Sequence, residues 1–369
     1  MDLLDRIAHK SIVIVLGDGG VGKTSVAAAL AALAAASGRR VLAVTVDPSN
    51  RLKDALGLRG PPGEEEEVPL LDFDAKAGGF LRAMVLDAAT ELERLAREAG
   101  VQGRITDHVF FRKAATRLAG AHEYAAFARV ADALESSRYD LVVLDTPPER
   151  HALDFIDAPS KLDTLLGQGL LDAFIGSLSR AGTRTVRFRR LVLLGVGRLA
   201  GEDTFISVLN FLLDLVPVYE SYRTRAARVR QLFATPACAA IVVCRPGRPV
   251  GSIAALRARG IEPAAVLANR VLTWPSTGGH GMVDAAIMKD ALALEPALGL
   301  LDRDALSALA TRVLHLAQVY RERANEDAVQ VARLRDAVAP VPVHVVSELG
   351  FDLSDLRGLA HLARALSQA

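Results

Sequence analysis

Short apolar segments recur along the chain, with longer stretches of helical character between them. They consist mainly of Val, Ile, Leu and Ala and do not alternate strictly with polar residues. Runs of this kind, bounded by turn residues, are typical of parallel strands that are buried on both faces. The segments predicted as strands are residues 11–17, 39–47, 139–148, 239–244, 264–271 and 341–346.

The first two predicted strands are joined by an Ala-rich helix over residues 24–38. It ends near Gly38, a residue that commonly closes a helix because it adopts a left-handed backbone at no steric cost. A strand, a helix and a second strand of these lengths form a βαβ unit. The sequence therefore predicts an α/β fold with a doubly wound, mostly parallel sheet.

Two intervals interrupt this alternation. Residues 76–136 and 151–235 have apolar positions at spacings of three and four, the period of amphipathic helices. We interpret the whole chain, residues 1–369, as one domain with a helical subdomain inserted through these intervals. The helices either cover the sheet or form an apolar surface that also meets a client or partner protein. The acidic stretch at 60–67 is expected to be a solvated loop.

Composition limits the classes of partner. The 44 Lys and Arg residues nearly balance the 43 Asp and Glu residues, so no basic surface for nucleic acid is expected. The longest apolar segments carry an Asp and are too short to span a bilayer, so stable membrane insertion is not expected. Only two cysteines occur, in no zinc or redox spacing, and no signal peptide is recognised. We expect a cytoplasmic protein.

Residues 17–24, "GDGGVGKT", fit the pattern G-x-x-x-x-G-K-[ST] after a strand and before a helix. Glycines allow main-chain N–H groups to surround phosphates, and Lys23 adds a point charge on the β- and γ-phosphates. Thr24 is expected to bind Mg²⁺. The sequence thus predicts ATP or ADP as ligand, held by Gly19, Gly20, Val21, Gly22, Lys23, Thr24 and Ser25.

Two acidic residues at strand ends complete the predicted chemistry. Phosphoryl transfer needs an acid behind the metal and a group that positions water. Asp145 ends the apolar run at 141–144 and is the candidate metal ligand, together with Thr24. Asp47 ends the second predicted strand and is the candidate catalytic residue that orients water, with Lys23 as the other catalytic residue. The structural alternative for either aspartate is a helix cap or turn former.

Several motifs together resemble the arsenite-pump ATPase family, which includes the guided-entry ATPases that deliver tail-anchored membrane proteins. The GKGGVGKT loop of the family is matched by residues 17–24, with Asp18 in place of the first lysine. Its two switch motifs resemble "DPSN" at 47–50 and "DTPPERH" at 145–151, the latter in a form similar to the bacterial branch. Its helix with a G-x-x-E pattern resembles residues 119–130.

The resemblance implies a P-loop ATPase of the deviant Walker A class. It also implies that Asn269 reads the adenine base and that residues 341–359 cover it. In the family, the first lysine of the loop reaches across a dimer interface to the phosphates held by the partner. A carboxylate at Asp18 would repel those phosphates and disfavour a symmetric dimer with two bound ATP molecules.

A second departure also concerns contacts made in trans. Residues 244–247 read "CRPG", whereas family members carry an acid there that contacts the partner's ribose. The two departures favour a heterodimer with a paralogous ATPase subunit. The alternative is a homodimer in which Arg150 or Arg51 replaces the missing cation.

The leading hypothesis is a slowly hydrolysing, dimeric ATPase switch. Its nucleotide state would rearrange an apolar helical surface for a client or partner, which could be a hydrophobic or membrane protein. The alternative is a nucleotide-dependent interaction subunit that does not hydrolyse ATP and regulates a catalytic paralogue. A DNA-partitioning ATPase fits less well, because the chain lacks a basic excess.

Overall fold

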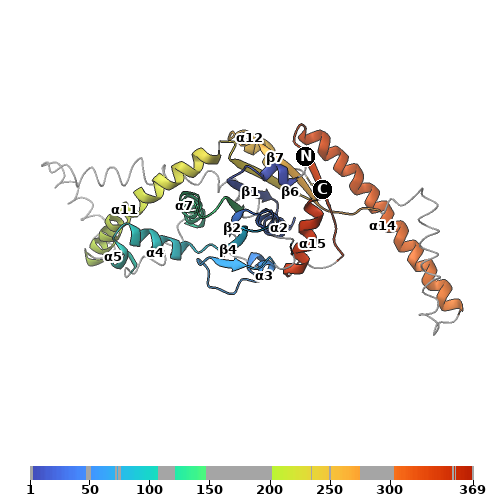
Figure 1. The fold of residues 1–369 in the computed structure, drawn as a ribbon, viewed down its shortest axis with the longest axis horizontal. Coiled ribbons are helices and arrows are strands. Elements are labelled where there is room, and N and C mark those ends of the chain that lie inside the picture. Colours follow the sequence, from blue (N-terminus) through green and yellow to red (C-terminus); the bar gives the residue numbers. More distant parts are fainter. Residues whose placement is uncertain are drawn as a thin grey trace.

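An eight-stranded sheet forms the centre of the computed structural model, in the order β3-β4-β2-β5-β1-β6-β7-β8 (Figure 1). Neighbouring strands are parallel, except that β3 and β4 are antiparallel. This confirms the predicted α/β class. The structure describes residues 3–46, 51–70, 73, 76–106, 121–146, 202–233, 235–248, 251–274, 303–350, 353 and 355–367.

The strands span Ile12–Gly17 (β1), Arg40–Thr45 (β2), Glu66–Val68 (β3), Phe80–Val85 (β4), Leu141–Asp145 (β5), Cys238–Cys244 (β6), Pro263–Val271 (β7) and Val343–Ser347 (β8). The helices are Leu3–Ile7 (α1), Lys23–Ala36 (α2), Arg51–Leu56 (α3), Ala88–Glu98 (α4), Gln102–Thr106 (α5), Ala121–Glu135 (α7), Glu202–Phe233 (α11), Gly251–Arg257 (α12), Arg303–Val338 (α14) and Leu356–Ser367 (α15).

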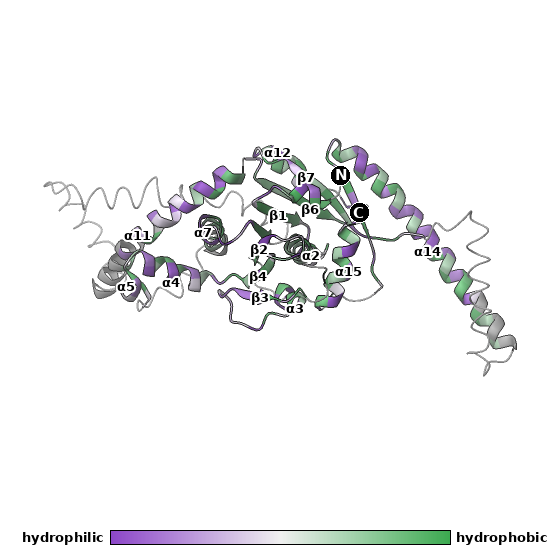
Figure 2. Cartoon of the chain, viewed as in Figure 1, coloured by the Kyte–Doolittle hydropathy of each residue, from purple (hydrophilic) through white to green (hydrophobic). Residues whose placement is uncertain are grey.

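Helices cover both faces of the sheet. Alternate residues of β1 point to opposite faces: Ile12 and Ile14 belong to one apolar cluster, and Val13 and Val15 to another. The first cluster is completed by α4, α5, α7, α11 and α12, the second by α1, α2, α3 and α15. The central strands are hydrophobic along their length (Figure 2), because helices remove both of their faces from water.

All six strands predicted from apolar runs are present, as β1, β2, β5, β6, β7 and β8. The prediction missed the sheet edge. Residues 80–85 were predicted to be helical but form β4, whose Leu81 and Ala83 are buried while Arg82 reaches the edge carboxylate of Glu65. The predicted loop at 60–67 overlaps β3, an acidic edge strand that pairs Glu66 with Ala83.

The other described parts of the two helical intervals are helical, as α4, α5, α7 and α11. Figure 1 shows them gathered at one end of the molecule, with α7 between the sheet and α11. Residues 107–120 and 151–201 lie outside the described residues, so the extent of a helical subdomain stays a prediction.

Charged side chains fasten α7 on two sides. Arg129 of α7 contacts Glu65 beside β3 at 2.5 Å. Three residues further on, Asp132 accepts a hydrogen bond of 2.7 Å from Arg225 of α11 and pairs with Arg94 of α4. These ion pairs are only partly exposed to solvent, so salt screens them less than it screens surface pairs. Helix α7 is thus bound both to the sheet edge and to the neighbouring helices.

Helix α14 is 36 residues long and extends from the opposite end of the sheet (Figure 1). Its C-terminal half packs beside β7 through Val331 and Leu334. In the part of the chain that the structure describes, no helix has a stretch both long and apolar enough to cross a membrane.

Candidate functional site

The loop between β1 and α2 requires glycine at both of its ends. A Cβ atom on Gly17 would lie 2.1 Å from the main-chain oxygen of Val243 on β6, so only glycine allows β1 to end this close to its neighbour. Gly22 has a φ of 96°, and a Cβ atom there would lie 2.4 Å from Nδ2 of Asn269. The first end of the loop is therefore packed against β6 and its second end against Asn269 of β7.

Asn269 fastens the loop from β7. Its side-chain nitrogen donates a hydrogen bond of 2.7 Å to the main-chain oxygen of Val21, and the residue is buried. Val21 is itself buried, and this bond gives its main-chain oxygen a hydrogen-bond partner. The structure thus gives Asn269 a role in holding the loop. The role in reading adenine that the resemblance implies stays a prediction.

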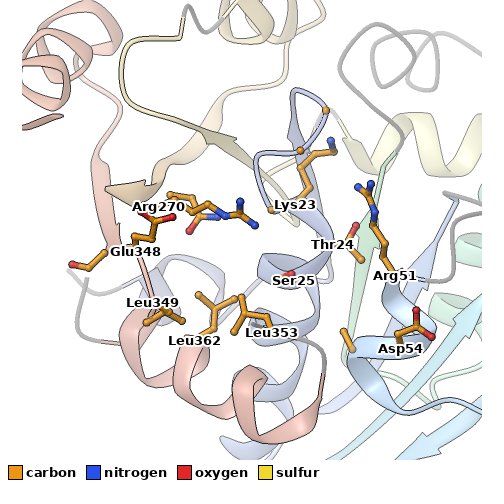
Figure 3. Close-up of a pocket in the computed structure, with 16 residues that line it drawn as sticks. Lys23, Thr24, Ser25, Arg51, Asp54, Arg270, Glu348, Leu349, Leu353 and Leu362 are labelled. Atoms are coloured by element: carbon orange, nitrogen blue, oxygen red, sulfur yellow. The ribbon is translucent and has the colours of Figure 1, made fainter. Parts of the chain in front are cut away.

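The loop forms one wall of a cavity of about 660 Å³ (Figure 3). The predicted phosphate-binding residues Gly19, Gly20, Gly22, Lys23, Thr24 and Ser25 all line it, and so does Asn269. The other lining residues come from α3, from the end of β7 and from the β8–α15 segment, which here means the end of β8, the connection that follows and α15 itself. They are Arg51, Asp54, Ala55, Arg270, Ser347, Glu348, Leu349, Leu353 and Leu362.

The cavity has a charged end and an apolar end. Arg270 and Arg51 extend from opposite sides toward the space in front of Lys23 and Thr24 (Figure 3). The leucines from the β8–α15 segment gather at the other end, below Arg270. This division suits a ligand with an anionic part and a flat apolar part.

Lys23 is buried, and its ammonium group donates a hydrogen bond of 2.8 Å to the main-chain oxygen of Asp18. Asp18 is not among the described residues that line the cavity. Burial, together with the charge of Asp18, raises the pKa of the thiol of Cys244, the last residue of β6, to about 11. The acid in the loop is therefore not part of the described cavity lining, whose carboxylates are Asp54 and Glu348.

Asp145, the candidate metal ligand, is not among the described residues that line the cavity. It ends β5 beside β1, in register with Val15, and is 1% exposed. Thr45, opposite it on β2, donates a hydrogen bond of 2.9 Å to its Oδ2 atom. The next residue, Thr146, donates a hydrogen bond of 2.8 Å to the main-chain oxygen of Val15, which fixes the strand end.

These residues fit a magnesium ion. A carboxylate held in one orientation and a hydroxyl at the start of a helix are oxygen ligands of the kind that Mg²⁺ prefers when it also binds phosphates. Asp145 and Thr24 would supply them. Asp47 and Arg150 lie outside the described residues, so their predicted roles are untested. Arg51 is described, and it lies within the cavity of its own chain.

The sequence analysis missed Arg270. Between Asn269 and Val271 the pairing of β7 with β8 shifts by one residue, and Arg270 has a φ of 58° at this bulge. Two consecutive side chains, Asn269 and Arg270, therefore reach the same cavity, whereas a regular strand would send them to opposite faces. In the sequence, the only signal for a role of Arg270 at the site is that it directly follows Asn269, which the resemblance identified.

Comparison with known proteins agrees with this geometry. Residues 10–190 match the profile of the family described as anion-transporting ATPase, a segment that contains the phosphate loop, Thr45 and Asp145. The chain belongs to this ATPase family. The match ends before β6, so Asn269, Arg270 and the leucine wall lie outside the matched residues.

Individual relatives extend the likeness. The chain is 32% identical over 197 residues to the ATPase GET3 of Rhodotorula glutinis, a match that covers 50% of this chain and 53% of that protein. It is 28% identical over 244 residues to the ATPase get3 of Schizosaccharomyces pombe, covering 64% of this chain and 63% of the relative. A Mycobacterium tuberculosis protein is 43% identical over 88 residues, or 23% of this chain and 21% of that protein. The chain thus spans less than two thirds of the length of these relatives.

Proposed function

We propose that this chain binds ATP with Mg²⁺ and hydrolyses it slowly. The observation that supports the proposal is a single cavity in which the phosphate loop, Lys23 and Thr24 face an apolar wall of leucines. The triphosphate would lie along the loop, whose main-chain N–H groups and helix N-terminus favour anions. The base would lie against the leucines, and Asn269 at the cavity edge would take part in reading it.

The ammonium group of Lys23 would exchange its present hydrogen-bond acceptor for a phosphate oxygen when a nucleotide binds. This group is bound to the main-chain oxygen of Asp18 at 2.8 Å, a neutral acceptor. A phosphate oxygen is a charged acceptor and forms a stronger bond, so a bound nucleotide would draw Lys23 from the loop carbonyl. Arg270 and Arg51 add positive charge at the same end of the cavity. Charge neutralisation is the main contribution a protein makes to phosphoryl transfer.

Thr24 and Asp145 would hold the magnesium ion, which neutralises phosphate charge when it is bound. The hydrogen bond from Thr45 keeps the Asp145 carboxylate in one orientation, so little reorganisation would accompany binding. Asp47 follows β2, the strand that carries Thr45, and we propose it as the residue that orients the attacking water.

We further propose that the ATPase works as a dimer whose nucleotide state rearranges the helices α4, α7 and α11 for a client or partner. Asp18, the second residue of the loop, would determine which kind of dimer forms. Asp18 is not among the described residues that line the chain's own cavity, and across an interface its charge would weaken a partner's site. That asymmetry favours a paralogous partner subunit. We place the protein in the cytoplasm.

Asp18 also favours a second candidate function. If no partner supplies the missing lysine, the chain would bind nucleotide without turnover and act as a regulatory subunit of a catalytic paralogue. The two functions share the binding site and differ only in hydrolysis.

The test compares ATP binding and turnover of the wild-type chain with Lys23→Ala and with the matched control Lys76→Ala, which removes an exposed lysine outside the cavity. We expect Lys23→Ala to weaken ATP binding at least about tenfold, because each 1.4 kcal/mol corresponds to a factor of ten, and Lys76→Ala to change nothing. Absence of nucleotide binding by the wild type would contradict both candidate functions.

Asp18→Lys separates the two functions. Light scattering and turnover are measured for this variant with and without ATP. Dimerisation and a gain of activity in Asp18→Lys would support the switch ATPase and direct the search to a partner. Binding with no turnover in either chain would leave the regulatory subunit. An active wild-type homodimer would show that another cation, Arg51 or Arg150, replaces the lysine.

A further inference from the structure

A second cavity lies beside the end of β6. It has a volume of about 440 Å³ and is enclosed by the loop after β6, by α12 and by the C-terminal half of α14. Ile253, Leu334 and Val338 form its apolar floor and belong to the cluster on one face of the sheet. None of its lining residues lines the cavity of the phosphate loop.

Four arginines line this second cavity: Arg245, Arg248, Arg257 and Arg333. The described lining residues include no aspartate or glutamate. Arg257 is paired with Glu262 at 3.2 Å. For Arg245, Arg248 and Arg333, the described part of the chain provides no ion-pair partner.

Arg245 is the least solvated of the three. Its Nε atom is buried and has no hydrogen-bond partner within the described residues. A buried donor on a charged group costs free energy when it is unpaired, and most such groups in folded proteins are bonded to protein, water or a ligand. An anion in the cavity would provide the missing acceptor.

The arginines come from segments that are held together. Gly247 has a φ of 74°, and the main-chain N–H of Arg248 donates a 3.2 Å hydrogen bond to the oxygen of Arg245, so the loop turns sharply between the two side chains. A Cβ atom on Gly247 would lie 3.6 Å from Cγ of Gln330, which shows that the loop rests on α14, the helix that carries Arg333. Three positive charges are thus brought together by packing, although their mutual repulsion opposes it.

We propose that this cavity binds a small soluble molecule that carries two linked phosphate groups. Guanidinium groups match phosphate oxygens with paired hydrogen bonds, which makes arginine the preferred residue for such anions. A diphosphate carries a charge of about −3 near neutral pH when one of its groups is terminal, which balances the three arginines without an ion-pair partner. The volume of the cavity is within the usual range for small-molecule sites. The apolar residues of its floor would contact a non-polar substituent of the ligand.

The site is independent of the proposed ATP site, because the two cavities share no residue and each has its own cations. The test uses inorganic pyrophosphate as the probe and titration calorimetry as the readout. Pyrophosphate also fits a phosphate loop, so all measurements are made in the Lys23→Ala background. The comparison is between this chain, the same chain with Arg248→Gln and Arg333→Gln, and the same chain with Arg335→Gln.

Arg335 is the matched control, because it is an exposed arginine of α14 that does not line the cavity. Arg248 and Arg333 are exposed as well, so their replacement leaves the packing of the core unchanged. We expect Lys23→Ala to retain one pyrophosphate site. The two substitutions in the cavity should weaken it at least tenfold, and Arg335→Gln should leave it unchanged.

Three outcomes would overturn the proposal. One is loss of all pyrophosphate binding in Lys23→Ala, which would assign the anion to the phosphate loop alone. Another is equal weakening by Arg335→Gln or equal affinity for sulfate, since either would indicate an unspecific effect of net charge. The third is binding to vesicles that contain phosphatidylglycerol with no affinity for pyrophosphate, which would make the arginines a membrane contact.

Discussion

Asn269 and Val21 are 248 residues apart in the chain and are joined by a hydrogen bond of 2.7 Å between the side-chain amide and the main-chain oxygen. The bond connects the end of β7 to the phosphate loop, two elements that do not pair in the sheet. The shape of the loop therefore depends on a strand from the other end of the sequence.

Replacing Asn269 should weaken nucleotide binding in a graded way. Asn269→Ala removes the bond and leaves a buried carbonyl unpaired, which costs about 1–3 kcal/mol. Asn269→Asp places a carboxylate against the same carbonyl and beside the phosphates, so its loss of affinity should be larger. Calorimetric titration with ATP and Mg²⁺ measures the order. Equal affinity in wild type and Asn269→Ala would show that the loop holds its shape without this bond.

Gly22→Ala should disrupt the loop, because its Cβ atom would lie 2.4 Å from Nδ2 of Asn269 at a φ of 96°. We expect a lower thermal midpoint and loss of nucleotide binding. Gly19→Ala is the control for stability, because a Cβ atom there meets nothing within 4 Å. The clash and the backbone strain are separable: adding Asn269→Ala to Gly22→Ala should recover part of the stability. Purely additive losses in that double-mutant cycle would mean that the two residues do not interact.

Thr45→Val should destabilise the protein by about 1–3 kcal/mol, since the buried Oδ2 atom of Asp145 loses the hydrogen bond from Thr45. The proposed magnesium site should weaken with it. Urea unfolding measures the first effect, and the Mg²⁺ concentration required for half-maximal ATP binding measures the second. Thr45→Ser keeps the hydroxyl and should resemble wild type in both. A Thr45→Val variant with unchanged Mg²⁺ dependence would exclude Thr45 from positioning the carboxylate.

Glu65 should make stability depend on pH in the acid range. Burial opposes its ionisation, but the hydrogen bond from Tyr139 and the charges of Arg129, Arg138 and Arg82 outweigh burial and lower its pKa. A carboxylate with a lowered pKa in the folded state stabilises the protein above its unfolded pKa, and this contribution is lost as the pH falls. Denaturant unfolding between pH 7 and pH 3 should therefore show a decline that Glu65→Gln flattens.

The same Glu65→Gln variant should already be less stable at pH 7 by about 1–3 kcal/mol, because partly buried arginines lose their counter-charge. Glu67→Gln is the matched control, since Glu67 is an exposed neighbour on β3. Parallel pH profiles for wild type and Glu65→Gln would contradict the role of Glu65.

The sequence predicted the parts of the fold that are determined locally. Buried parallel strands and a loop of fixed pattern leave a clear signal in residue order, so strands β1, β2, β5, β6, β7 and β8 followed directly. The places of Lys23 and Thr24 at the start of α2 and of Asp145 at the end of β5 followed in the same way. Strand β4 gave a weaker signal, because its apolar run is interrupted by Arg82, which is paired with an edge carboxylate.

The remainder of the site depends on tertiary structure. Arg270 reaches the cavity because β7 bulges where it pairs with β8, and a shift in pairing is not encoded by either strand alone. Asn269 was identified from the resemblance, but its bond to Val21 requires knowledge of where β7 ends relative to the loop. The arginine cavity joins residues almost 90 positions apart, so no local motif indicates it.

The two attachments of α7 determine how movement could pass through this molecule. Arg129 and Asp132 lie less than one helical turn apart, so α7 cannot rotate about its axis without stretching the contact to Glu65 or those to Arg94 and Arg225. A shift of α11 would therefore move α7 as well, and the contact between Arg129 and Glu65 would transmit that movement to the edge of the sheet. Strand β4 pairs with β2, and Thr45, the last residue of β2, donates a hydrogen bond to Asp145. A displacement of the helices at this end of the molecule would therefore change the orientation of the Asp145 carboxylate.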